Sequence, residues 1–73
     1  ESSFRVWWGE HIDNADLAGA DMTGANLSFA LIQNSNLSGA DFTGTAFFYT
    51  EIKDCDLTDA NMVGVNDHGS SGL

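Results

Sequence analysis

The sequence has no proline, a single cysteine and only two positively charged side chains, Arg5 and Lys53. One cysteine excludes a disulfide within the chain. No apolar run is long enough to cross a bilayer, so we expect no transmembrane segment. Eleven acidic residues give a net charge of −9, which argues against direct binding to nucleic acid or anionic lipid.

The length of 73 residues allows one small domain, and its glycines are unevenly placed. Gly19, Gly24, Gly39, Gly44 and Gly64 lie five or twenty residues apart. Such spacing indicates an internal repeat.

A large apolar residue returns at every fifth position, as in "NADLAGADMTGANLS". We call these apolar residues the centres of the pentads, and Trp7 is in phase with them, five residues before the first. They are Ile12, Leu17, Met22, Leu27, Ile32, Leu37, Phe42, Phe47, Ile52, Leu57 and Met62. A small residue stands two positions before most centres, and in extended backbone both would face the same side. A period of five fits neither a helix nor a straight strand, so the chain must turn a corner within each pentad.

Side-chain identity follows a longer period of twenty residues. The like centres form four columns of Ile12, Ile32, Ile52; Leu17, Leu37, Leu57; Met22, Phe42, Met62; and Trp7, Leu27, Phe47. Four pentads per turn explain this period, which predicts a square solenoid with coils about 4.8 Å apart. The centres would then form ladders in the core.

The pentads "ADLAG", "ADMTG", "ADFTG" and "CDLTD" resemble those of the pentapeptide repeat proteins. The resemblance implies an all-β fold, a right-handed quadrilateral β-helix of about 2.5–3 coils. It covers residues 10–66, because Asp67 occupies a centre position. Residues 1–9 are expected to form an N-terminal cap in which Trp7 and Phe4 cover the first coil. Residues 67–73 are expected to form a mobile C-terminal tail.

Acidic side chains concentrate on two adjacent sides of the predicted coil. This acidic face consists of Asp16, Asp21, Asp41, Asp56 and Asp59. One interpretation is structural, since Asp or Asn before a centre can satisfy backbone groups at a corner. The other follows from the resemblance, because some family members imitate duplex DNA and inhibit DNA gyrase. A coil of eleven pentads would be only about 13 Å long and match about four base pairs, so mimicry would require an end-to-end dimer.

Five large apolar side chains project outward where most other pentads carry small or polar residues. This aromatic strip consists of Trp8, Phe29, Leu31, Phe48 and Tyr49. The cap or the tail could fold over the strip. A contiguous exposed apolar patch is more typical of a contact with a protein partner or a second copy, and we predict docking through it.

The other reactive side chains form no recognisable site. Cys55 falls in a small inward position, which favours an inert thiol. His11 and His68 lie at opposite ends of the coil without zinc-ligand spacing, and no segment matches a calcium loop. No nucleophile has a base beside it, and a filled core leaves no pocket. We therefore expect no catalysis, no cofactor, no metal and no small-molecule substrate.

These features predict a non-catalytic structural or protein-interaction module, a rigid acidic solenoid that docks on a larger protein assembly through the aromatic strip. The alternatives are a DNA-mimicking regulator of an enzyme such as DNA gyrase, and a repeat module from a longer secreted effector. The family has members in the thylakoid lumen. The missing initiator methionine is compatible with a processed protein of that or another exported compartment, which we expect to be soluble.

Overall fold

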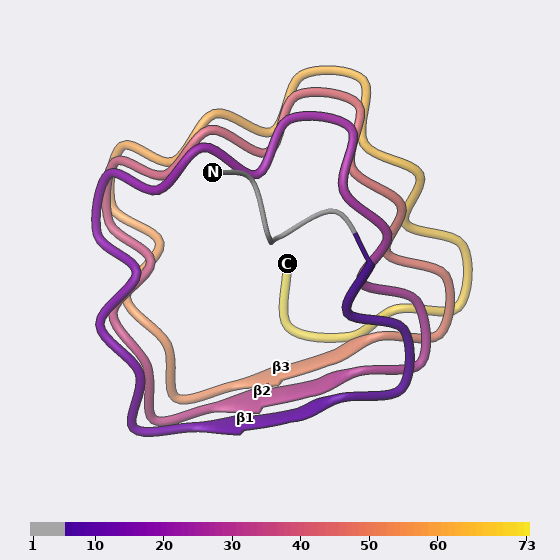
Figure 1. Ribbon diagram of the computed structural model, residues 1–73, viewed down its shortest axis with the longest axis horizontal. Helices are drawn as coiled ribbons and strands as arrows, with labels where there is room; N and C mark the ends of the chain where they lie inside the picture. The colour runs from indigo at the N-terminus through magenta and orange to yellow at the C-terminus, as the bar shows by residue number, and fades with distance from the viewer. Residues whose placement is uncertain (1–5) are drawn as a thin grey trace.

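Residues 6–73 are described by a computed structural model, in which the regular structure is entirely β. Three short strands, β1 (His11–Asp13), β2 (Leu31–Gln33) and β3 (Glu51–Lys53), form one parallel sheet in the order β1-β2-β3. The described residues contain no helix. Ile12 pairs with Ile32, and Ile32 pairs with Ile52, so the register advances by twenty residues at each step. The predicted all-β class and the parallel stacking are thus confirmed (Figure 1).

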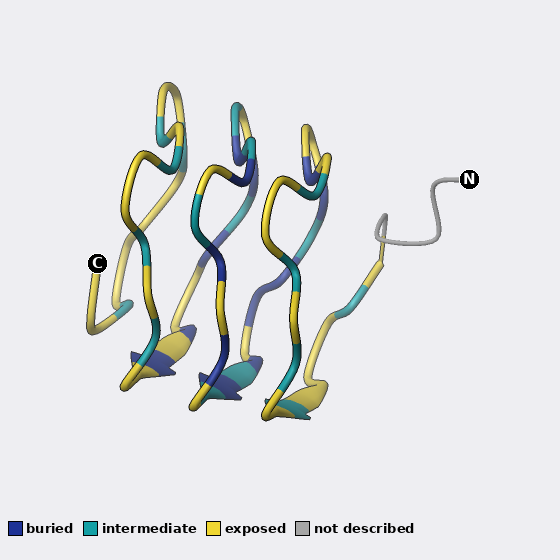
Figure 2. Ribbon diagram, turned by 90° about the vertical axis from the view of Figure 1, so that its left-hand side faces the viewer, coloured by how far each residue is buried: buried dark blue, intermediate teal, exposed yellow. Residues whose placement is uncertain are grey.

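Isolated parallel bridges continue the same register around the rest of each turn of the chain. They join Asp16 to Asn36 and Asn36 to Asp56, and Asp21 to Asp41 and Asp41 to Asn61. A further column runs from Val6 through Asn26 and Ala46 to Asn66. Viewed from the side, the successive turns lie next to one another as separate coils (Figure 2).

The corners are built from backbone turns that follow many of the apolar centres. The carbonyl group of Leu17 accepts a hydrogen bond from the Ala20 amide at 3.0 Å, and that of Met22 accepts one from Ala25 at 3.0 Å. The third residue of these two turns, Gly19 or Gly24, has a φ of 70° or 69°. A positive φ at this position is typical of a type II turn and favours glycine, which explains the glycine spacing of the sequence.

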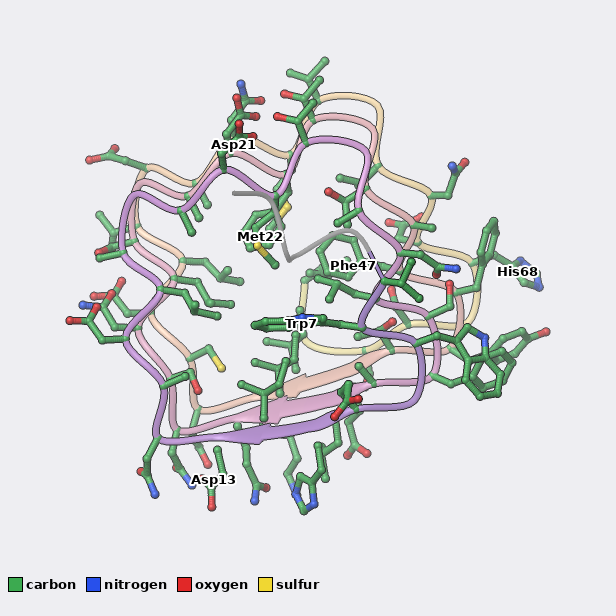
Figure 3. The ribbon with its side chains drawn as sticks, viewed as in Figure 1. Trp7, Asp13, Asp21, Met22, Phe47 and His68 are labelled. Atoms are coloured by element: carbon green, nitrogen blue, oxygen red, sulfur yellow. The ribbon has the colours of Figure 1, made fainter. Side chains whose placement is uncertain are left out.

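The core is the inside of the coil, and the central turns are the most deeply buried (Figure 2). Figure 3 shows Trp7, Met22 and Phe47 pointing inward, whereas Asp13 and Asp21 point outward. The buried centres are Met22, Leu27, Ile32, Leu37, Phe42, Phe47 and Ile52. The half-buried centres are Ile12, Leu17, Leu57 and Met62. Those four belong to the first and last turns, where only one side is covered by a neighbouring turn.

The coil extends beyond both boundaries expected from the sequence. Val6 already pairs with Asn26, and Ser71 still pairs with Glu51. The predicted tail is therefore hydrogen-bonded as far as Ser71. Asp67 replaces an apolar centre but remains exposed, and its carbonyl group still accepts the hydrogen bond of the following turn from Ser70. A polar centre thus ends the core without ending the backbone pattern.

The two ends of the chain relate differently to the predicted caps. Trp7 is half-buried and packs against the core, as expected of a covering residue, whereas Phe4 lies outside the described residues. The last residues turn inward across the end of the coil (Figure 1). Gly72 lies so close to Ile52 that an added Cβ would stand 1.9 Å from the Ile52 carbonyl oxygen.

Candidate functional site

Four rings from successive turns lie in contact along one outer edge of the coil. The indole of Trp8 and the ring of Phe29 have centroids 5.3 Å apart at an interplanar angle of 52°. Phe29 stacks on Tyr49 at 5.5 Å and 19°, and Tyr49 meets the imidazole of His68 edge-on at 5.6 Å and 88°. We call Trp8, Phe29, Tyr49 and His68 the ring ladder. His68 points outward, away from the core (Figure 3).

The ring ladder crosses between two neighbouring columns of the coil. Trp8 and His68 belong to one column, whereas Phe29 and Tyr49 belong to the next, between Gly9 and Gly69. A Cβ on Gly69 would lie 2.5 Å from Cδ1 and Cε1 of Tyr49. The Tyr49 ring therefore occupies the space above Gly69, and the side chain of the preceding residue, His68, supplies the last ring.

Phe29 and Tyr49 hold a backbone conformation that bulky residues rarely adopt. Their φ angles are 64° and 58°, in the left-handed region. The other described residues with positive φ are glycine, or Asn and Asp: Asn14, Asn34, Asp54 and Asp59. Asn and Asp tolerate this region, whereas an aromatic residue there stores strain of about 1–3 kcal/mol. Such strain is found more often at functional positions than elsewhere.

The ladder rings are also well exposed. The exposed fraction is 57% for Trp8, 53% for Phe29 and 54% for Tyr49. His68, from the segment predicted to be a tail, joins the ladder at its end and leaves more than half of Tyr49 exposed. That segment therefore extends the apolar surface.

The remaining two residues of the predicted strip are placed less favourably. Phe48 is 38% exposed, and Ser28 separates it from Trp8 in their shared column. Its amide donates a hydrogen bond to Ser28 Oγ at 3.3 Å. Leu31 is half-buried in β2, in register with His11 and Glu51. The structure thus brings Trp8, Phe29 and Tyr49 together in a contact series and adds His68, which the sequence analysis missed. The sequence signal for His68 was its position directly before Gly69, which lies in the column of Phe29 and Tyr49.

The acidic face consists mostly of residues engaged in local turns. An Oδ1 of Asp16, Asp21, Asp41 and Asp56 accepts the backbone amide two residues later, at 3.2, 3.1, 3.0 and 3.0 Å respectively. Asn36 and Asn61 make the same bond at 3.0 Å. Asp59 lies elsewhere, in an exposed corner with φ of 59°. The carboxylates therefore support the corners, in the way the structural interpretation of the sequence predicts.

Two of these carboxyl groups are held ionised by their neighbours. The Thr43 hydroxyl donates to Asp41 Oδ1 at 2.5 Å, and that of Thr58 donates to Asp56 Oδ1 at 2.6 Å. Together with the backbone amides of the same threonines, these bonds lower the pKa of Asp41 and Asp56 below 3.8. For Asp41 the nearby charge of Asp21 opposes the shift. Hydrogen bonds to the charged form are the dominant cause.

The remaining reactive groups lie apart from one another. Cys55 is half-buried, less covered than an inward position predicts, and its thiol lies 3.3 Å from the Lys53 carbonyl oxygen. Within residues 6–73, no three His, Cys, Asp or Glu side chains come together as a metal site would require. The described surface has no pocket, and no described helix could cross a membrane. His11 contacts Gln33 across β1 and β2 at 3.5 Å.

Comparison with models of known protein families gives a match. The model of the pentapeptide repeats family matches eight copies of its repeat, over residues 11–47 and 25–64. A search of curated proteins finds no match. Proteins with these repeats generally have structural or protein-interaction roles and are generally not enzymes. Since the matched segments span more than half of the chain and their register agrees with the parallel coil, the chain belongs to the pentapeptide repeat family.

Proposed function

We propose that this chain is a non-catalytic docking module, which binds a larger protein assembly through the ring ladder and the adjoining Phe48. In this proposal the coil is a right-handed quadrilateral β-helix that acts as a rigid support. Four pairing columns for each twenty-residue step support four sides per turn. The filled interior supports rigidity, because interdigitated side chains resist deformation.

The observation that carries the proposal is the conformation of Phe29 and Tyr49. Both residues expose more than half of their surface, and both hold a left-handed backbone at a position where glycine would be unstrained. Exposure and strain each disfavour these residues in the free protein. Burial of the rings against a partner would offset both costs, since aromatic side chains contribute strongly to binding at interfaces.

The DNA-mimic alternative has weaker support. The carboxylates of Asp16, Asp21, Asp41 and Asp56 do lie in regular columns, as mimicry requires. The molecule, however, measures 23 × 21 × 21 Å, so its longest dimension spans about seven base steps of duplex DNA. Mimicry would need a longer assembly. Unchanged supercoiling by DNA gyrase in the presence of the protein, together with a monomer in sedimentation, would exclude it.

The third alternative, a repeat module from a longer secreted effector, concerns the gene rather than the site. Further pentads before Glu1 or after Leu73 in the parent gene would establish it. Residence in the thylakoid lumen or another exported compartment likewise stays a proposal, which localisation of the tagged native protein would test.

The docking proposal is tested by removing one ring of the ladder, that of Trp8, together with the adjoining ring of Phe48. Trp8→Ser combined with Phe48→Ser should abolish retention of the native partner in a pull-down, while the circular dichroism spectrum stays unchanged. Val63→Ser is the matched control, because Val63 is 67% exposed in a different column and makes no part of the ladder. Retention of the same partner by the double variant would contradict docking through Trp8 and Phe48.

A further inference from the structure

The ring ladder has an electrostatic surrounding that bears on the chemistry of its partner. Glu51 lies two residues after Tyr49, and it precedes the buried Ile52, so its exposed carboxylate is on the outer face of β3. Glu10 and Asp67 are also close in sequence to the ladder, but they lie in the columns of the buried Thr50 and Phe47, which face the core. Lys53, the one lysine of the sequence, is the last residue of β3. The outer face beside the ladder therefore carries the carboxylate of Glu51, in a molecule whose net charge is −9.

This charge disfavours a second copy of the chain as the occupant. Two copies packed ladder to ladder would bring two net charges of −9 together. Like charges juxtaposed at an interface are costly and select against that partner. A positively charged occupant is attracted by the same field, and its approach is accelerated.

The rings themselves are suited to guanidinium and ammonium groups. The indole of Trp8 ends the ladder, tilted 52° from Phe29 and 57% exposed, so part of its face is open. Phe29 and Tyr49 stack with centroids 5.5 Å apart, a separation typical of offset rings that leave part of each face uncovered. Cations bind to such faces, best to tryptophan, and arginine also pairs with carboxylates through two parallel hydrogen bonds.

We propose that the occupant of the ring ladder is a cationic protein segment, whose arginine or lysine side chains lie against Trp8, Phe29 and Tyr49. A charged group of the segment pairs with the exposed carboxylate of Glu51. The inference rests on the proposed docking function and adds the chemical class of the partner.

The test uses the whole chain and a short synthetic peptide of alternating glycine and arginine as the probe. A matched peptide carries citrulline, which has the shape of arginine without its charge. In calorimetric titrations the arginine peptide should bind and the citrulline peptide should bind at least several-fold more weakly. Each ring removed, by Trp8→Ser or Phe29→Gly, should weaken binding of the arginine peptide about two- to five-fold, the range expected of an exposed cation–π contact. Equal binding of the two peptides to the native protein would overturn the proposal. Equal binding of the arginine peptide to the native protein and to the two variants would overturn it as well.

A second pair of variants separates a local site from general charge attraction. Glu51→Gln removes the exposed carboxylate beside the ladder, and Asp59→Asn removes an exposed carboxylate in another column. The first variant should weaken peptide binding more than the second. Equal effects would reduce the interaction to net charge and contradict the proposal.

The outcome is distinguishable from that of the docking experiment. If Trp8→Ser with Phe48→Ser releases the native partner but the arginine peptide does not bind, docking stands and the cationic class is wrong. If sedimentation detects a dimer of the native protein that Trp8→Ser abolishes, the occupant is a second copy, and the proposal is again wrong.

Discussion

Phe29 and Tyr49 stack at 5.5 Å and 19° across two adjacent turns, although each residue holds a left-handed backbone that a glycine would adopt without strain. The pair therefore combines a favourable ring contact with an unfavourable backbone. An exposed aromatic pair contributes about 0.5–1.5 kcal/mol beyond the area that it buries, which is comparable to the strain. The balance between the two terms can be measured.

Phe29→Gly should change the free energy of unfolding by no more than about 1 kcal/mol, because loss of the ring contacts is offset by relief of strain. Urea denaturation of the purified variant measures this change. Phe47→Ala is the contrasting variant, since Phe47 is fully buried in the core. It should cost about 3–5 kcal/mol through the cavity that it leaves. Similar losses in the two variants would show that the ladder is as important to folding as the core.

Gly69→Ala should displace the Tyr49 ring, because the new Cβ would lie 2.5 Å from two of its atoms. The measurement is the NMR chemical shift of the Tyr49 ring protons and their contacts to His68. Gly64→Ala is the control, since its φ of 72° matches the 75° of Gly69 while its Cβ would meet only backbone at 3.8 Å or more. Both variants should lose stability through the positive φ. A Tyr49 ring that stays in place in Gly69→Ala would contradict the close approach.

Thr45→Val should lower the free energy of unfolding by about 0.5–1.5 kcal/mol, the value of one buried hydrogen bond. The Thr45 hydroxyl is fully buried and donates to the Met22 carbonyl oxygen at 2.7 Å. That oxygen also accepts from the Ala25 amide, so the substitution leaves no unsatisfied acceptor. Thr50→Val, which removes an equivalent bond to Leu27, should behave alike in urea denaturation. An unchanged stability in both would mean that these hydroxyl groups only fill space.

The lowered pKa of Asp41 makes part of the stability dependent on pH. In the folded protein Asp41 prefers its charged form, so its contribution is present above the reference pKa of 3.8 and is lost as the pH falls through the lower folded value. The stability difference between the native chain and Asp41→Asn should therefore shrink as the pH is lowered below 3.8. Asparagine is a suitable replacement, because Asn36 and Asn61 make the same turn bond.

Thr43→Val provides the control for this prediction. It removes the largest cause of the shift, so the pKa of Asp41 should rise toward 3.8 in an NMR titration of its carboxyl carbon. A pKa that is unchanged by Thr43→Val would assign the shift to another group.

The regular part of the fold could be predicted from spacing because each column contains one kind of side chain. Ile12, Ile32 and Ile52 pair in register as their common column requires. The ends could not be predicted in this way. Asp67 marks the end of the apolar core, yet the backbone bonds that define the coil continue to Ser71, since they need no apolar side chain.

The ladder was only partly predictable for a related reason. Columns assign each side chain a place directly above its equivalent, which would group Trp8 with Phe48. Large rings reach the neighbouring column, so the observed contacts run from Trp8 to Phe29 and from Tyr49 to His68. Positive φ at Phe29 and Tyr49 could not be predicted from residue type, because aromatic residues rarely adopt this region. The equivalent positions that carry glycine, asparagine or aspartate were the available signal.

The constant register of twenty residues determines how this chain can change in length. Every strand pairs with residues twenty positions away, so deletion of a single residue within β2 would move each later side chain to the wrong column. Insertion of a whole block, such as a second copy of residues 34–53, would preserve every column and add one turn. Length variation by entire turns is thus the tolerated form of growth, and this insertion would add a second residue equivalent to Tyr49, which would lengthen the ladder by one ring.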